Sequence, residues 1–241
     1  MPRSLVDELR AQPPGLHGGG AEYWGLAWEA LEWLEREVRP GMATLETGSG
    51  ASTLVFAAGG TEHEAVTPSA DEEERFRAEC ERRAIDGSRV AFRIGLSHEV
   101  LPALDARPLD LVLVDGAHGF PYPILDWWFL AGRVRLGGRM LLDDAYMPPV
   151  RALVDALRAQ PGWELERAAS FRTAVVRKVA DGLPSFDWEG ERIGGGMSFG
   201  YLPPGSRVVA TARQRVFSTR LGLKAVELAR RRTGLRFRRR G

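Results

Sequence analysis

The stretch Met42–Thr53, which reads MATLETGSGAST, decides the fold. Its apolar start predicts a short strand, and the run Ala51–Ala58 predicts a helix. Gly48 and Gly50 lie between the two, where glycine lets the backbone turn tightly and approach a ligand. The acid Glu46 stands two residues before the first glycine, a position that suits a ligand with an ammonium group better than a pyrophosphate. The stretch therefore predicts a strand–turn–helix unit that binds a ligand at its turn.

Outward from this unit, strands and helices alternate along the chain. A helix is predicted at 22–39, further strands at 63–66, 90–94, 111–114 and 140–142, and further helices at 71–85, 124–134 and 150–159. Such alternation implies parallel βαβ units in a doubly wound, Rossmann-like α/β sheet. The last two strands, 163–168 and 173–179, are joined by only about four residues, a connection that permits only antiparallel pairing.

The composition indicates a folded domain without disulfides. The 241 residues are 44% hydrophobic, which is enough to form a core. The single cysteine, Cys80, excludes an internal disulfide and a multi-cysteine zinc site. The first residues lack the apolar region of a signal peptide, and no apolar run approaches the roughly 20 residues that span a bilayer. We therefore expect a cytoplasmic protein.

Charge is distributed unevenly along the chain. Residues 207–241 hold twelve Arg or Lys and one acid, a net charge of +11, so the total of +1 leaves −10 for residues 1–206. Phe217, Leu221, Lys224, Ala225 and Leu228 fall near helical spacing. We therefore expect a basic tail, partly an amphipathic helix, that contacts an anionic membrane or an acidic partner.

Acidic residues follow three of the predicted strands. Glu46, Asp115 and the pair Asp143-Asp144 stand where these strands end. In doubly wound sheets, ligands bind beyond the carboxyl ends of the strands. The acids are therefore expected to converge on one ligand site.

Together these motifs resemble the class I S-adenosylmethionine-dependent methyltransferases. The unit around Glu46 is similar to their acid-x-Gly-x-Gly motif, LVLVDGAH at 111–118 to their fourth motif, and LLDD at 141–144 to their fifth strand. GLSHEVLPAL at 95–104 resembles the catechol O-methyltransferase-like group. The resemblance implies about seven strands, with the last one antiparallel. It also divides the chain into an N-terminal helical segment (1–41), an S-adenosylmethionine-binding domain (42–180) and a C-terminal extension with the basic tail (181–241).

The resemblance also implies a set of cofactor-binding residues. The turn around Glu46, Gly48, Ser49 and Gly50 would bind S-adenosylmethionine, with Ser97 and His98 beside the adenine and Asp115 near the methionine end. The chain departs from the family after its second strand, where an acid usually binds the ribose hydroxyls. Here Thr67-Pro68-Ser69 follows. The hydroxyls of Thr67 and Ser69 would replace that acid, or Asp71 or Glu72 would turn toward the ribose.

The expected reaction is O-methylation of a small hydroxylated metabolite or sugar. Asp115, Asp143 and Asp144 would hold Mg²⁺, which prefers carboxylate oxygens. His118 stands where the catechol O-methyltransferase-like enzymes carry a catalytic lysine, and a histidine can accept the proton of a hydroxyl. Tyr122 and Tyr146 are candidates for an acceptor pocket, whereas Trp127 and Trp128 are expected in the core.

Three other functions are compatible with such a sheet. An NAD-type oxidoreductase is disfavoured because Thr53 stands where a third glycine would be expected. A nucleic-acid methyltransferase that uses the basic tail is disfavoured because Asp115-Gly116-Ala117-His118 replaces the Asn/Asp-Pro-Pro-aromatic motif of amino-methylating DNA enzymes. A binding module without turnover would retain the fold alone. Titration with S-adenosylmethionine and NAD separates the first of these from a methyltransferase.

Overall fold

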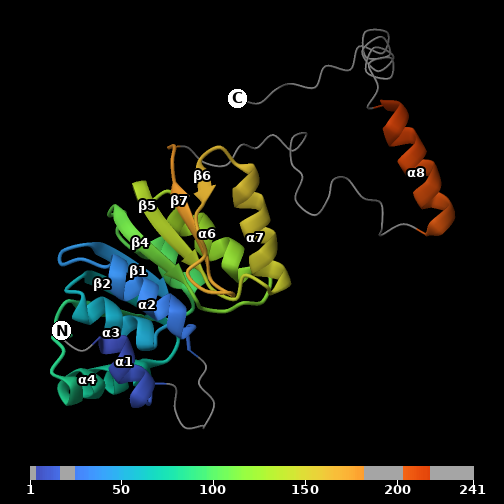
Figure 1. Cartoon of the computed structure of the whole chain (residues 1–241). Coiled ribbons are helices and arrows are strands. Elements are labelled where there is room, and N and C mark those ends of the chain that lie inside the picture. Colours follow the sequence, from blue (N-terminus) through green and yellow to red (C-terminus); the bar gives the residue numbers. More distant parts are fainter. Residues whose placement is uncertain (1–3, 17–24, 182–202, 218–241) are drawn as a thin grey trace. The chain divides into compact units, whose positions relative to one another are not determined.

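The computed structural model describes residues 4–16, 25–181 and 203–217. The chain forms two compact units, Met1–Ile193 and Gly194–Gly241 (Figure 1). The first unit holds the sheet and all of the residues that are expected to bind the cofactor, to bind a metal ion or to act in catalysis.

A seven-stranded sheet forms the centre of the first unit. Its strands are β1 (Ala43–Thr47), β2 (Glu62–Thr67), β3 (Val90–Ile94), β4 (Leu109–Val114), β5 (Val134–Leu142), β6 (Trp163–Leu165) and β7 (Ala174–Lys178). They lie in the order β3-β2-β1-β4-β5-β7-β6, and only β7 runs antiparallel to its neighbours. The predicted doubly wound sheet with an antiparallel last strand is therefore confirmed.

Helices cover both faces of this sheet. They are α1 (Leu5–Ala11), α2 (Trp28–Glu37), α3 (Ala51–Ala58), α4 (Ala70–Arg83), α5 (Ser97–Val100), the short 3-10 helix η1 (Leu101–Ala103), α6 (Tyr122–Ala131) and α7 (Pro148–Ala159). The sequence patterns predicted neither α5 nor η1, because both are shorter than the window over which helical periodicity is visible.

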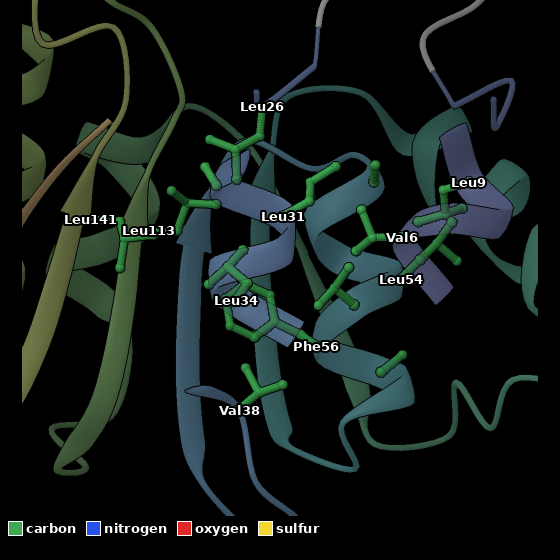
Figure 2. Close-up of a cluster of buried hydrophobic side chains, with 14 of the residues drawn as sticks. Val6, Leu9, Leu26, Leu31, Leu34, Val38, Leu54, Phe56, Leu113 and Leu141 are labelled. Carbon is green, nitrogen blue, oxygen red and sulfur yellow. The ribbon is translucent and has the colours of Figure 1, made fainter. Parts of the chain in front are cut away.

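Side chains that alternate along the buried strands contribute to two hydrophobic cores, one on each face of the sheet. In β4, Leu111 and Leu113 pack toward α1–α4, whereas Val112 and Val114 pack toward α6 and α7. Figure 2 shows the first core, in which sheet side chains such as Leu113 and Leu141 share one cluster with side chains of the helices. Burial on both faces explains why the strand reads as a continuous apolar run.

The N-terminal helices belong to the first core. Val6 and Leu9 of α1 are fully buried, and Figure 2 shows both in the cluster that includes Leu54 of α3. Arg83 of α4 pairs with Glu8 of α1 at 2.6 Å. The helical segment predicted at 1–41 therefore packs directly onto the sheet domain.

Several predicted element boundaries are wrong. The helix expected at 124–134 ends at Ala131, and Val134 already begins β5. β5 is longer than the expected 140–142 because it continues through Gly137, whose φ of +79° is a conformation that favours glycine. The helix expected at 22–39 begins at Trp28, and residues 22–24 lie outside the described residues.

Cys80 is a core residue of α4. It lies in the first core together with Phe76 of the same helix. Its burial raises the pKa of its thiol to about 11. Cys80 therefore contributes to packing and stays protonated at neutral pH.

The second unit contains α8 (Pro204–Phe217), whose side chains at 203–209 are exposed. The amphipathic segment expected from Phe217 to Leu228 begins where this helix ends, and residues 218–241 lie outside the described part of the chain. Among the helices of the described residues, none is both long enough and apolar enough to cross a membrane.

Candidate active site

A cavity of about 430 Å³ opens at the carboxyl ends of β1, β2 and β4. This is the point at which the strand order reverses, because β1 lies between β2 and β4. The turn after β1, the end of β2, α5, the loop after β4 and Gly25-Leu26 form its walls. The volume lies within the range of small-molecule and cofactor sites.

Gly48 forms the point at which the turns after β1 and β4 touch. Its φ is +93°, and a Cβ atom at this position would lie 2.5 Å from the backbone oxygen of Asp115. The backbone N–H of Gly48 donates to Val66 at 2.8 Å. Only glycine fits this conformation and this approach, so the turn predicted from the Gly-x-Gly motif is present. Gly48, Ser49 and Gly50 all line the cavity.

Glu46 lies outside the cavity lining. Its buried carboxylate accepts hydrogen bonds from Ser52 at 2.6 Å and from Thr53, and lies 3.1 Å from His63 Nε2. His63 in turn contacts Thr44 at 2.8 Å. The Glu46 carboxylate therefore fixes the first turn of α3, and its hydrogen-bond partners are side chains of the protein. The pairing with His63 was not predicted, because 17 residues of sequence separate the two side chains.

Glu72, in the first turn of α4, lies beside the end of β2, where the sequence has no acid. Its carboxylate accepts hydrogen bonds from Thr67 at 2.6 Å and from Ser49. All three residues line the cavity. Ser69 does not line it, and its backbone N–H donates to the Thr67 hydroxyl at 3.3 Å. Of the two acids expected as substitutes, Asp71 instead pairs with Arg75 at 3.9 Å.

Ser97 and His98 of α5 line the cavity from the side of β3. The His98 ring lies 5.4 Å from the ring of Tyr122, which also lines the cavity. Gly95, at φ +149°, turns the chain between β3 and α5. The structure thus brings both predicted adenine-binding residues to the cavity, beside one of the tyrosines expected near an acceptor.

Asp115 and His118 line the other part of the cavity and lie close together. His118 Nε2 is 3.4 Å from Asp115 Oδ1, and His118 Nδ1 is 3.6 Å from Asp144 Oδ2. Burial raises the pKa of Asp115 to about 7, and the neighbouring Asp115 raises the pKa of His118. The two groups therefore form a coupled carboxyl–imidazole pair in which each perturbs the pKa of the other, as is common at sites of proton transfer.

The acid pair after β5 lies behind this site and outside the cavity lining. Asp143 is buried; it accepts a hydrogen bond from Thr173 at 2.6 Å on Oδ1 and one from Arg172 at 3.1 Å on Oδ2. Asp144, in the left-handed region at φ +50°, lies 3.5 Å from Arg172 Nε. Arg172 was not predicted, because it reaches the pair from the loop between β6 and β7.

Three of these side chains offer ligand atoms for a metal ion. Atoms of Asp115, His118 and Asp143 lie within 4.8 Å of one another. This set has His118 in place of the Asp144 expected from the sequence. Oxygen and imidazole ligands suit a divalent cation, but both oxygens of Asp143 already have protein donors, and one of these is a guanidinium. The set therefore does not fit a divalent ion without displacing Arg172.

The aromatic residues near the site divide differently from expectation. Trp127 is buried in the second core as predicted. Trp128 is 40% exposed, so the expectation that it packs in the core is wrong. Tyr146 is 59% exposed and does not line the cavity.

Comparison with known proteins identifies the domain. Residues 45–145 match a family model described as a methyltransferase domain. No match is found among curated proteins. Among solved structures, an O-methyltransferase from Bacillus cereus in complex with SAH aligns at 18% identity, covers 75% of this chain and 93% of that chain, and has a TM-score of 0.58.

Two further structures agree on the fold. The O-methyltransferase TomG from Streptomyces achromogenes, involved in tomaymycin synthesis and solved with SAM, is 16% identical, with coverage of 75% and 92% and a TM-score of 0.58. A putative caffeoyl-CoA O-methyltransferase from Staphylococcus aureus is 13% identical, with coverage of 74% and 93% and a TM-score of 0.56. With the strand order and the matched motifs, these findings show that the chain carries a methyltransferase domain with the class I methyltransferase fold.

Proposed function

We propose that the chain transfers a methyl group from S-adenosylmethionine to a hydroxyl group of a small molecule. The observation that carries this proposal is the composition of a single cavity. Glu72, Ser49 and Thr67 line it at the edge of β2, and Asp115 and His118 line it beyond β4. The first group suits the hydroxyls of a ribose, and the second suits proton removal from an acceptor.

The cofactor would be held by this chain's own version of the family site. The Glu72 carboxylate accepts the ribose hydroxyls in place of Ser49 and Thr67, its present donors. Gly48 lets the cofactor approach the backbone, and Ser97 and His98 lie beside the adenine. Glu46 acts indirectly, by fixing the start of α3 beneath the turn.

The reaction is an in-line displacement at the methyl carbon. The acceptor oxygen forms a bond to that carbon while the bond to sulfur breaks, and the sulfonium becomes a neutral thioether. The hydroxyl proton passes to His118, which Asp115 orients and stabilises as a cation. Holding the two reactants in line contributes a large part of the rate, of the order of 7–11 kcal/mol in the best intramolecular cases.

Three lines of support bear on the reaction class. The resemblance of 95–104 to the catechol O-methyltransferase-like group and the neighbours described as O-methyltransferases favour an oxygen acceptor. A histidine beside an acid is a suitable base for a hydroxyl. Mg²⁺ and a cytoplasmic location stay predictions; a divalent ion, when bound, would lower the pKa of the acceptor hydroxyl.

Calorimetric titration with S-adenosylhomocysteine and with NAD tests the proposal. We expect the first ligand alone to bind. Glu72→Gln should weaken its binding about 10- to 100-fold, because a hydrogen bond to a charged group contributes about 1.5–3 kcal/mol. Asp71→Asn is the matched control, since the neighbouring Asp71 side chain is 79% exposed and lies outside the cavity. Equal binding of NAD, or unchanged affinity in Glu72→Gln, contradicts the proposal.

A further inference from the structure

Arg172 is the cation nearest to the acid pair after β5. Its Nη2 atom donates to Asp143 Oδ2 at 3.1 Å, and its Nε atom lies 3.5 Å from Asp144 Oδ1. The same Nη2 atom donates to the backbone oxygen of Gly25 at 2.6 Å. The guanidinium therefore lies between the two carboxylates and the segment that precedes α2.

The surroundings require a positive charge at this place. Asp143 is 1% exposed and Asp144 is 7% exposed, and Asp115 lies on the other side of His118. Adjacent buried carboxylates without a cation are strongly unfavourable. Arg172 neutralises one of them permanently, because a guanidinium stays charged at any physiological pH.

The contact between Arg172 and the Asp143–Asp144 pair is incomplete, so a divalent ion can compete with the guanidinium for these carboxylates. Asp144 Oδ1 and Arg172 Nε are both buried and form no hydrogen bond within the described residues. The Asp143 side is well bonded, whereas the Asp144 side is held by charge alone. A compact divalent ion prefers the same carboxylate oxygens, so the two cations compete for one place.

We propose that Arg172 is the resident counter-ion of the Asp143–Asp144 pair, and that a divalent metal ion binds there only by displacing its guanidinium. The chain itself thus supplies a positive charge behind His118, where the sequence led us to expect a magnesium ion. This inference concerns the acid pair and holds whichever acceptor is methylated.

Displacement of Arg172 would also change the hydrogen bonding of the cavity wall. Gly25 and Leu26 line the cavity, and Arg172 is a donor to the Gly25 carbonyl. A metal ion that removes this donor breaks one hydrogen bond of the segment before α2, beside the cavity. Metal binding and cofactor binding are therefore antagonistic, and linkage makes the effect reciprocal.

Binding of Mn²⁺ to the metal-stripped full chain, followed by electron paramagnetic resonance of the free ion, tests this proposal without any methyl acceptor. We expect wild type to bind Mn²⁺ only in the millimolar range. Arg172→Met removes the charge but keeps much of the volume, and it should bind Mn²⁺ at least about tenfold more tightly. Adding Asp144→Asn to Arg172→Met should remove this gain.

Two variants serve as matched controls. Arg172→Lys keeps a positive charge and should stay close to wild type. Arg177→Met removes a charge from β7, where the partners Glu164 and Glu166 are at the surface, and should not gain affinity. A folded Arg172→Met without tighter Mn²⁺ binding overturns the proposal.

If Arg172→Met fails to fold, Mn²⁺ binding to wild type and to Asp144→Asn tests the proposal independently. Micromolar binding of Mn²⁺ to wild type that Asp144→Asn abolishes overturns the proposal. Millimolar binding that Asp144→Asn weakens further supports it. S-adenosylhomocysteine titration of the same samples reports separately on the cofactor site, so failure of the proposed function is distinguishable from failure of this inference.

Discussion

His118 is the residue on which the proposed chemistry depends most directly. Its Nε2 atom is buried and forms no hydrogen bond within the described residues, and Asp115 Oδ1 lies 3.4 Å away. Such an atom is available to a hydroxyl group that enters the cavity. The raised pKa of His118 means that the base is neutral, and active, only on the alkaline side of its ordinary titration range.

We predict that His118→Gln lowers the rate of methyl transfer to an accepted hydroxyl substrate by about 10²- to 10⁴-fold, the usual contribution of a general base. Single-turnover measurement with radiolabelled S-adenosylmethionine reports this rate. The affinity for S-adenosylhomocysteine should stay near that of wild type, which separates loss of the base from loss of the cofactor site. A variant that keeps its rate between pH 6 and 9 excludes His118 as the base.

Single residues also show where inference from the sequence ends. Gly48, Asp115 and His118 were predicted because their roles follow from positions within one strand–turn unit. Glu72 was considered only as an alternative to Thr67 and Ser69, since a side chain's direction at the start of a helix depends on its neighbours in space. Arg172 left no signal at all, because Asp143, to which it is hydrogen-bonded, lies 29 residues earlier and follows a different strand.

At the scale of elements, α6 carries an unusual buried acid. Asp126 is fully buried, and neither of its oxygens forms a hydrogen bond within the described residues. Burial raises its pKa, and nearby Ser97, Thr47, His98 and His118 only partly offset this effect. The folded state therefore holds a proton on Asp126 at pH values at which the unfolded chain has lost it, so its contribution to stability falls as pH rises above the unfolded pKa.

Asp126→Asn is predicted to raise the free energy of unfolding at pH 8 by about 1–3 kcal/mol relative to wild type, because it removes the cost of a buried charge. At pH 5 the difference should shrink, because the raised pKa favours the protonated native carboxyl as the pH falls. Urea unfolding at both pH values measures it. Asp155→Asn, on the 52%-exposed acid of α7, is the control and should show no such dependence. A difference that does not change with pH contradicts the assignment.

The elements that were predicted well are those whose pattern is local and uninterrupted. The bounds of α3 and β3 agree with the expectation because each is a mostly apolar segment that is followed directly by a glycine, Gly59 or Gly95. β5 was predicted too short because a strand that continues through Gly137 cannot be told from a turn without its partner strand. Pairing of Leu109 with Val134, across a register shift in β4, extends the strand beyond its apolar part.

At the scale of the whole molecule, the two units carry net charges of opposite sign. Residues 194–206 contain no charged side chain, so the unit Gly194–Gly241 carries the full +11 of the tail and Met1–Ile193 carries −10. The described part of the second unit is a helix with exposed Arg207, Val208 and Val209. A basic segment of this kind favours contact with an anionic surface.

We predict that a chain ending at residue 193 keeps its affinity for S-adenosylhomocysteine but no longer sediments with anionic vesicles, whereas the full chain does. Sedimentation with phosphatidylserine vesicles, with neutral vesicles as the control, measures the difference. Binding of the full chain should fall as salt is added, because exposed charges are screened. Equal recovery of both chains excludes the membrane contact, and loss of cofactor binding in the shorter chain shows that the second unit takes part in the cofactor site.

The burial of Cys80 has a practical consequence for chemical labelling. With a pKa of about 11, only about one thiol in 10,000 is ionised at pH 7, and the side chain is 4% exposed. A maleimide dye will therefore leave the native cysteine unreacted. Ser206→Cys places a second thiol on the exposed start of α8, where the same dye attaches. The protein thus accepts a single fluorophore without removal of its native cysteine, and the emission of the dye can follow the tail as vesicles are added.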